Sequence, residues 1–388
     1  MPDLAGWRRV RVRGPRAEID RTLARLRARR DVLSVFEAPR AELPVVEPTV
    51  TDDESCPIRT PPYERLQGYL GPAPAGIGAA AAWSAPGGRG DGVWFADVEG
   101  GWNDKHEDLA GDRVRAIGRR MPGRYWEAHG TAVLGEVVAR DNELGMYGIA
   151  PAVPRVVTSS IADVSSATAI DLAQAELRPG DVLLIELHSK GPRGRFLPLE
   201  FWDDVFDAIR IATARGVVVI EAAGNGGEDL DHETYRGKLD RAGRDSGAIM
   251  VGAGAPAVKG WVDRSRLDFS NHGSRVDVQG WGRMVATLDY GDLQGCDATG
   301  RKYTNTFAGT SSASPIVAGA AILLEGIART ERGRPLSPTE LRRLLTETGS
   351  PQTDGPHGPA TEHIGPRPDV AKALARLRDH PGTGDVDP

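Results

Sequence analysis

Beyond residue 90, short apolar runs alternate with longer helical patterns along the chain. The runs with the length and composition of buried strands are Gly92–Asp97, Val153–Thr158, Asp181–Leu187, Gly216–Ala222 and Ala248–Val251. Helical patterns lie between and after them, at His129–Arg140, Asp163–Leu177, Leu199–Ala214 and Thr310–Thr330. This alternation predicts an α/β fold, a parallel sheet with helices on both faces, whose functional residues follow the carboxyl ends of the strands.

The N-terminal region has a pattern of its own. Trp7–Gly14 alternates like a strand, Pro15 opens an amphipathic helix, and Val32–Phe36 has the composition of a second strand. A β-α-β unit this small needs a larger domain to lean on. We therefore expect a small α+β module at residues 1–40, an exposed linker at 41–66, the main domain at 67–376 and a flexible C-terminal tail at 377–388.

Charge and hydropathy exclude some classes of partner. The chain has 48 Lys and Arg residues against 54 Asp and Glu residues, a formal net charge of -6. No overall positive field draws it to nucleic acid or to anionic lipid. The sequence lacks a continuous apolar stretch of about 18 residues and an apolar signal-peptide core near its start. We expect a soluble protein that is cytoplasmic or is exported by a non-classical route.

Only two cysteines are present, Cys56 and Cys296. This number excludes a disulfide framework and a CxxC metal site. Two reduced thiols are the favoured interpretation. The alternative is a single bridge from the linker to the main domain.

Four segments carry residue types that serine hydrolysis requires: a nucleophile, a base, a carboxylate that orients the base and a donor for the oxyanion. Asp97 ends a buried strand, and His129 precedes a glycine at the expected start of a helix. Ser311 begins a long apolar helix, where free backbone N–H groups favour an anion. Asn225 lies in a Gly-Asn-Gly turn after an apolar strand. Taken singly, each has an ordinary interpretation as a cap, a turn or a structural side chain.

Together these segments resemble the subtilisin-like serine protease family, from about Gln67 to about Leu374. The matching pieces, in order, are VWFADVEGGWNDKHEDL, HGTAVLGEV, GIAP, GVVVIEAAGNGG, AIMVGAG, FSNHGSRVDVQGWG and GTSSASPIVAGAAIL. The resemblance implies a serine endopeptidase, synthesised as a zymogen, that acts on protein or peptide substrates. It implies a triad of Asp97, His129 and Ser311, with Asn225 as an oxyanion-hole donor.

The chain departs from the family pattern in two places. A small residue and then a glycine usually follow the catalytic aspartate, whereas Val98 and Glu99 follow Asp97. The segment Leu184–Gly191, with His188 inside it, takes the place of the family's Ser-Leu-Gly substrate strand. We expect an unusual substrate cleft. Apart from His129, the histidines are expected to have surface or structural roles: His106, His188, His232, His272, His357, His363 and His380.

The resemblance also implies an inhibitor and a metal site. The module at residues 1–40 is expected to act as a propeptide that inhibits the enzyme; the alternative is a permanent accessory lobe or a partner-binding arm. The chemistry needs no cofactor, but a structural calcium is expected, because this cation prefers clustered carboxylate, amide and carbonyl oxygens. Its ligands would be the side chains of Gln67, Asp108 and Asn142 and the carbonyl groups of Arg140, Leu144 and Met146. The alternative is a polar surface loop.

Two further functions stay open at this point. A transpeptidase or macrocyclase of the same fold would pass the acyl group to an amine instead of water, and a non-catalytic scaffold would only bind peptides. The four acids after the Asn225 turn also predict a preference for basic side chains, unless they form a solvated loop: Glu228, Asp229, Asp231 and Glu233.

Overall fold

The computed structural model describes residues 4–43, 57–109, 111–296 and 300–379. Its centre is a seven-stranded sheet with the order β2-β3-β1-β4-β7-β8-β9. All its strand pairs are parallel. The strands are β1 (Trp94–Glu99), β2 (Val114–Ile117), β3 (Arg155–Ser160), β4 (Val182–Ile185), β7 (Val218–Ala222), β8 (Ile249–Gly254) and β9 (Val278–Trp281). The predicted parallel sheet is confirmed, and β2 and β9 extend it at its two edges.

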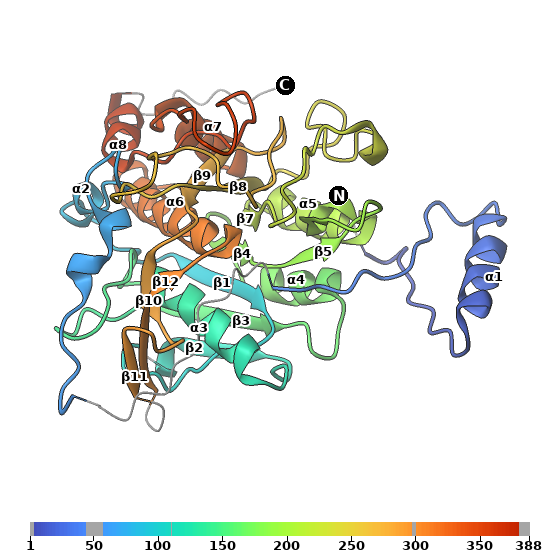
Figure 1. The fold of residues 1–388 in the computed structure, drawn as a ribbon, viewed down its shortest axis with the longest axis horizontal. Helices are drawn as coiled ribbons and strands as arrows, with labels where there is room; N and C mark the ends of the chain where they lie inside the picture. Colours follow the sequence, from blue (N-terminus) through green and yellow to red (C-terminus); the bar gives the residue numbers. More distant parts are fainter. Residues whose placement is uncertain (1–3, 44–56, 110, 297–299, 380–388) are drawn as a thin grey trace.

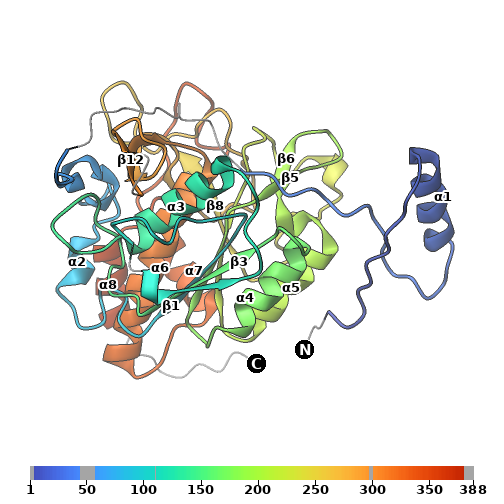
Figure 2. The ribbon, with the colours of Figure 1, turned by 90° about the horizontal axis from the view of Figure 1, so that it is seen from below.

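Helices cover both faces of this sheet (Figures 1 and 2). One core joins the sheet to α2 (Ala80–Trp83), α3 (Arg124–Val138), α6 (Thr310–Arg332), α7 (Pro338–Thr348) and α8 (Val370–Asp379). The other core joins it to α4 (Ser166–Ala175) and α5 (Asp203–Ala214). Strand residues alternate between the two cores, as the two-residue period of a strand requires: Val182 and Leu184 face the first, Leu183 and Ile185 the second.

Helix α6 runs through the first core. By length and composition it could cross a membrane, but its most apolar stretch is entirely buried inside the protein. Its small residues allow close packing. A Cβ atom on Gly319 would lie 2.6 Å from the Ile149 side chain, and one on Gly326 would lie 2.1 Å from the carbonyl oxygen of Gly87. The sequence Ala-Gly-Ala-Ala therefore fits a helix surrounded on all sides by protein.

Two small antiparallel sheets and several short 3-10 helices complete the main domain. The strands are β10 (Val285–Leu288), β11 (Gln294–Cys296) and β12 (Arg301–Phe307) in one sheet, and β5 (His188–Lys190) and β6 (Phe196–Pro198) in the other. The 3-10 helices are η1 (Glu64–Leu66), η2 (Gly68–Leu70), η3 (Gly111–Arg113), η4 (Leu199–Phe201) and η5 (Glu233–Tyr235). Cys296 is disulfide-bonded, so the favoured interpretation of two reduced thiols is wrong; Cys56 lies outside the described residues.

The N-terminal region differs from the prediction. It contains helix α1 (Arg16–Arg27), but Trp7–Gly14 and Val32–Phe36 do not form strands. Alternating arginines make the first of these segments charged on one side, and α1 projects from the main body with little of its surface covered (Figures 1 and 2). Without a second layer to bury their apolar side chains, two short strands gain too little to pair.

Candidate active site

The predicted base, His129, lies in the second turn of α3, because this helix begins at Arg124 rather than at His129. Its imidazole is fully buried. Nδ1 lies 2.7 Å from Oε2 of Glu99, the last residue of β1. Gly130 permits this approach, since a Cβ atom there would lie 2.2 Å from the carbonyl oxygen of Gly101 in the loop after β1.

Asp97 does not bond to His129, so its assignment as the orienting carboxylate is wrong. Its Oδ2 accepts a hydrogen bond of 2.6 Å from the indole N–H of Trp102, and its Oδ1 has no partner among the described residues. Asp97 and Glu99 point to the same face of β1, but Glu99 stands at the end of the strand, where the loops carry functional residues. With Glu99 as the carboxylate, the next residues are Gly100 and Gly101, which restores the small-residue and glycine pattern of the family.

Burial governs the charge of this pair. It raises the pKa of Glu99 well above its usual range and lowers the pKa of His129 to about 3. A hydrogen bond of 2.8 Å from the Gly100 N–H to Oε1 of Glu99 favours the carboxylate. Burial therefore keeps the imidazole neutral, and the Gly100 hydrogen bond counteracts the effect of burial on Glu99.

The nucleophile predicted at Ser311 lies in the first turn of α6, directly after Gly309 and Thr310, and is fully buried. The Phe307 ring, just before this helix, contacts the imidazole of His129 edge-on, with ring centroids 5.5 Å apart. Packing of α3 against α6 thus brings the predicted base and nucleophile to the same side of the sheet.

The predicted oxyanion donor, Asn225, is tied to the start of the same helix. Its Oδ1 accepts hydrogen bonds of 2.9 Å from both the backbone N–H and the hydroxyl group of Thr310. Both donors hold the oxygen end of the amide, so the NH₂ end must point away from Thr310. The structure therefore joins Asn225 to the residue that precedes Ser311.

A group of buried acids lies beneath this site, and the sequence patterns did not indicate it. Glu136 on α3 has no partner for either carboxylate oxygen within the described part of the chain. Oε1 of Glu186 and the Thr310 carbonyl oxygen both lie 2.7 Å from the Ser314 hydroxyl group, which has a single proton to share between them. Burial raises the pKa of both acids; repulsion from Glu186 adds to the rise for Glu136, and repulsion from Asp97 and Glu99 adds to it for Glu186. We infer that both are neutral acids.

His188, the first residue of β5, is the other residue that sequence reasoning missed. Its side chain is buried, and its Nδ1 accepts a hydrogen bond of 3.3 Å from the backbone N–H of Asn225. The sequence signal was its place in the segment that replaces the Ser-Leu-Gly strand. The buried side chain excludes the surface role expected for His188, while its contact with the Asn225 backbone is compatible with the structural one.

Comparison with known proteins agrees with this arrangement. The family model of the Subtilase family matches residues 96–365, well over half of the chain. The chain belongs to the subtilase family. Subtilisin DY of Bacillus licheniformis is 32% identical over 230 residues, which cover 57% of this chain and 70% of that protein. An intracellular serine protease of Paenibacillus polymyxa is 29% identical over 296 residues, which cover 72% of this chain and 81% of that protein.

Solved structures share the fold of this subtilase. A protease of Pseudoalteromonas arctica has a TM-score of 0.57 at 20% identity, with 82% of this chain and 99% of that chain covered. The prenylagaramide maturation protease PagA has a TM-score of 0.56 at 20% identity, with 77% and 98% covered. At these identities the likeness is one of fold alone.

A stretch of the N-terminal arm, the described residues 4–43, lies along β5 of the subtilase domain. Glu42 and His188 exchange two backbone hydrogen bonds, of 2.8 and 3.1 Å, in antiparallel orientation. The Ser189 hydroxyl group donates to the carbonyl oxygen of Arg40 at 2.8 Å, and Leu43 is buried in the second core. The arm also contacts α5, where Trp7 and Ser34 donate hydrogen bonds to Asp207 and Asp203.

The residues predicted to bind calcium form one cluster. Asp108 is fully buried, accepts a hydrogen bond of 2.7 Å from the Met146 N–H at Oδ2 and interacts with the side chain of Asn142. Its Oδ1 has no partner among the described residues, and burial raises its pKa to about 8. A cation would satisfy this oxygen and favour its charge.

The remaining donors of this cluster fit a calcium ion less fully. Oε1 of Gln67 accepts from the Tyr147 N–H at 2.7 Å, and a positive φ angle at Glu143 turns the loop that contains the Arg140 and Leu144 carbonyl groups. The cluster contains a single carboxylate from Asp108. Calcium binding therefore stays a prediction, and no step of the chemistry depends on it.

Two of the four acids after the Asn225 turn, Glu228 and Asp231, are occupied in other contacts. Glu228 is buried and forms ion pairs with Arg193 at 3.0 Å and Arg195 at 3.3 Å. It also accepts a hydrogen bond from the Tyr235 hydroxyl group. Asp231 accepts hydrogen bonds from the backbone and hydroxyl group of Ser274. These contacts neutralise Glu228 and hold Asp231 in a loop, so they argue against the predicted acidic specificity pocket.

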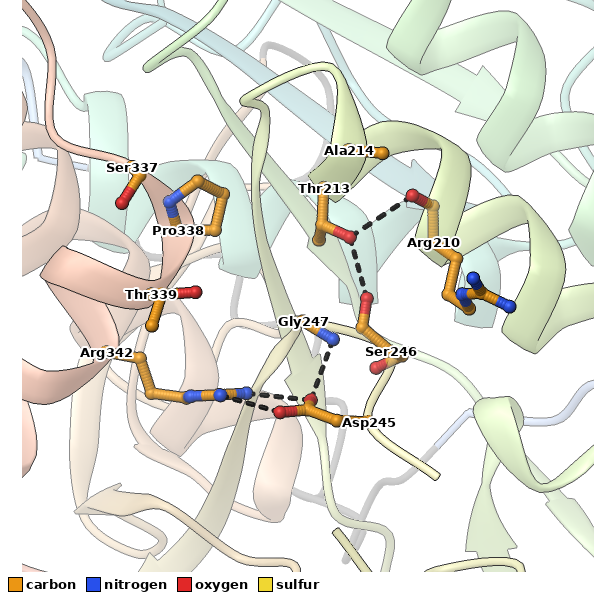
Figure 3. Close-up of a pocket in the computed structure, with 10 residues that line it drawn as sticks. All are labelled: Arg210, Thr213, Ala214, Asp245, Ser246, Gly247, Ser337, Pro338, Thr339 and Arg342. Carbon is orange, nitrogen blue, oxygen red and sulfur yellow. Dashed lines mark hydrogen bonds and ion pairs between the residues drawn. The ribbon is translucent and has the colours of Figure 1, made fainter. Parts of the chain in front are cut away.

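A cavity of about 400 Å³ lies away from the site, between the end of α5 and the start of α7 (Figure 3). Arg342 and Asp245 form an ion pair of 2.6 Å across it. The N-terminus of α7 is already satisfied by a capping box of Ser337 and Glu340. This cavity contains none of the predicted site residues.

Proposed function

We propose that this subtilase is a serine endopeptidase in which Ser311 is the nucleophile, His129 the base, Glu99 the orienting carboxylate and Asn225 an oxyanion donor. The observation that carries the proposal is the fully buried pair of His129 Nδ1 and Glu99 Oε2, 2.7 Å apart. A carboxylate on Nδ1 keeps the proton there and leaves Nε2 free to act as a base.

In the acylation step, Ser311 Oγ attacks the carbonyl carbon of the scissile peptide bond while its proton passes to Nε2 of His129. The carbonyl oxygen becomes an anion, which the Asn225 amide and the N-terminal end of α6 stabilise. His129 then gives the proton to the leaving amine, and an acyl-enzyme forms. Water, activated by the same imidazole, releases the acid and restores Ser311.

A transpeptidase of this fold would share the acylation step and differ only in the acceptor. Two structures with the fold carry the names of maturation proteases, PagA and PatA. These likenesses, at 20% and 22% identity, are of fold alone. Hydrolysis is the better-supported proposal, because a relative with higher identity, 29%, is named an intracellular serine protease.

The test is labelling with a fluorophosphonate followed by incubation with a peptide library, for the wild type and for Ser311→Ala. We expect the wild type alone to be labelled and to give cleavage products that have gained one water. Cyclic or joined products without added water would establish transpeptidation instead. A wild-type protein that is neither labelled nor active would leave only the peptide-binding scaffold.

We also propose that the N-terminal arm restrains the enzyme. Support comes from the antiparallel pairing of Glu42 with His188, which occupies the strand where the family binds its substrate. An extended peptide substrate needs the same backbone groups, so it competes with the arm. The contacts of Trp7 and Ser34 with α5 hold the rest of the arm against the domain.

A further inference from the structure

The ring of His188 is fixed by stacking and burial. It stacks on the ring of Phe196 in the paired strand β6, with centroids 3.9 Å apart and planes 6° from parallel. Only 2% of His188 is exposed. A histidine held this tightly in a substrate strand can serve the reaction only through the atoms that its nitrogens reach.

Those contacts define its tautomer. Nδ1 accepts the hydrogen bond from the Asn225 N–H at 3.3 Å, so it carries no proton. Nε2 is buried and has no partner among residues that the structure describes. Burial lowers the pKa of His188 to about 3, which keeps the imidazole neutral. His188 is therefore the Nε2–H tautomer, with Nδ1 as an acceptor.

The turn that carries Asn225 is held from three directions. Oδ1 of Asn271 accepts from the Gly226 N–H at 3.0 Å, and its Nδ2 donates to the Ala223 carbonyl oxygen. Thr310 holds the Asn225 side chain. The backbone N–H of Asn225 donates to His188, so this imidazole is the third group that holds the turn.

We propose that His188 is a positioning residue for oxyanion stabilisation, in which Nδ1 fixes the backbone of Asn225 so that its side chain amide meets the developing oxyanion. The inference rests on the proposed hydrolysis. A small displacement of a catalytic group, about 1 Å, can cost about 10²-fold in rate. Loss of the Nδ1 acceptor frees the Asn225 turn to move by such an amount.

Two isosteric substitutions separate this role from simple packing. In His188→Asn, the amide oxygen can take the place of Nδ1 and accept from Asn225. In His188→Gln, the amide lies farther out, where Nε2 was, and leaves the Asn225 N–H without its acceptor. We expect kcat of the full-length His188→Gln protein to fall about 10²-fold with KM nearly unchanged. We expect His188→Asn to keep most of the wild-type kcat.

A double-mutant cycle then tests whether His188 acts through Asn225. In an Asn225→Ala background, His188→Gln should cost no more than about threefold, because the group that it positions is absent. Fluorogenic-peptide turnover and thermal melting of each full-length variant provide the measurements.

Failure of the two proposals is distinguishable. A wild type that fluorophosphonate does not label overturns the proposed function and this inference with it. With a labelled wild type, any of three results overturns the role of His188 alone: wild-type kcat in folded His188→Gln, equal losses in the Asn and Gln variants, or the full loss retained in the Asn225→Ala background.

Discussion

Replacing Glu99 by glutamine should prevent His129 from acting as a general base. Oε1 of Glu99 accepts the Gly100 N–H at 2.8 Å, and Oε2 meets Nδ1 of His129 at 2.7 Å. A glutamine must turn its carbonyl oxygen toward Gly100 to keep the first bond, because an NH₂ group there would face another donor. Its NH₂ group then faces Nδ1 and donates to it. The imidazole proton is forced onto Nε2, the atom that must accept the proton of Ser311.

The size of the expected loss in kcat follows from the loss of the Nδ1–H tautomer of His129. The equivalent change of a triad carboxylate to its amide costs about 10⁴-fold in kcat, or about 5 kcal/mol in activation free energy. Burial of both side chains excludes water as a replacement acceptor at Nδ1. We therefore expect Glu99→Gln to lose about 10⁴-fold in kcat with little change in KM.

The matched control is Asp97→Asn, a change of the acid that lies two residues before Glu99 on the same face of β1. Its amide oxygen can still accept from Trp102, so we expect activity within about tenfold of the wild type. The assay is turnover of a fluorogenic peptide, with thermal melting to establish that each variant is folded. Near-normal activity in Glu99→Gln together with a severe loss in Asp97→Asn would refute the assignment of Glu99.

Three further outcomes follow from other contacts. Burial raises the pKa of Glu136, so the folded protein keeps its full stability while this acid is neutral, below the pKa of the unfolded chain, and loses stability as the pH rises toward the folded-state pKa. Glu136→Gln should therefore leave Tm unchanged at low pH and raise it at alkaline pH. An equal shift of Tm at every pH would contradict this. Glu42→Pro removes the N–H that donates to His188, so fluorophosphonate labelling should become faster, and an unchanged rate would count against restraint by the arm. Arg275 and Glu200 form a buried ion pair of 2.6 Å, so Arg275→Met should lower the free energy of unfolding by about 3–5 kcal/mol in urea titrations; a loss below about 1 kcal/mol would mean that Glu200 is satisfied without it.

The N-terminal region shows why local pattern has limits. Its apolar and polar residues alternate as a strand requires, and the predicted helix does form at Arg16–Arg27. A strand also needs a neighbour that pairs with it and a layer that covers one face, and neither is encoded locally. At the other end, α8 continues to Asp379 with Leu377 buried, so the ordered core extends beyond the predicted boundary at residue 376.

The sequence by itself determined the parallel sheet, the order of its elements and the segments that meet at its carboxyl edge. Strand and helix periods are local properties of the chain. The sequence pattern predicted Asp97 as the orienting carboxylate. Asp97 and Glu99 share a face of β1 because they are two residues apart.

The tertiary structure decided between them, although Gly100 and Gly101 directly after Glu99 were a local signal for Glu99. The choice depends on how far along β1 helix α3 places His129, and that is set by packing of α3 against the sheet and α6. The role proposed for His188 has the same origin. No local pattern connects it to Asn225, because their contact joins a short hairpin to a turn 37 residues later in the chain.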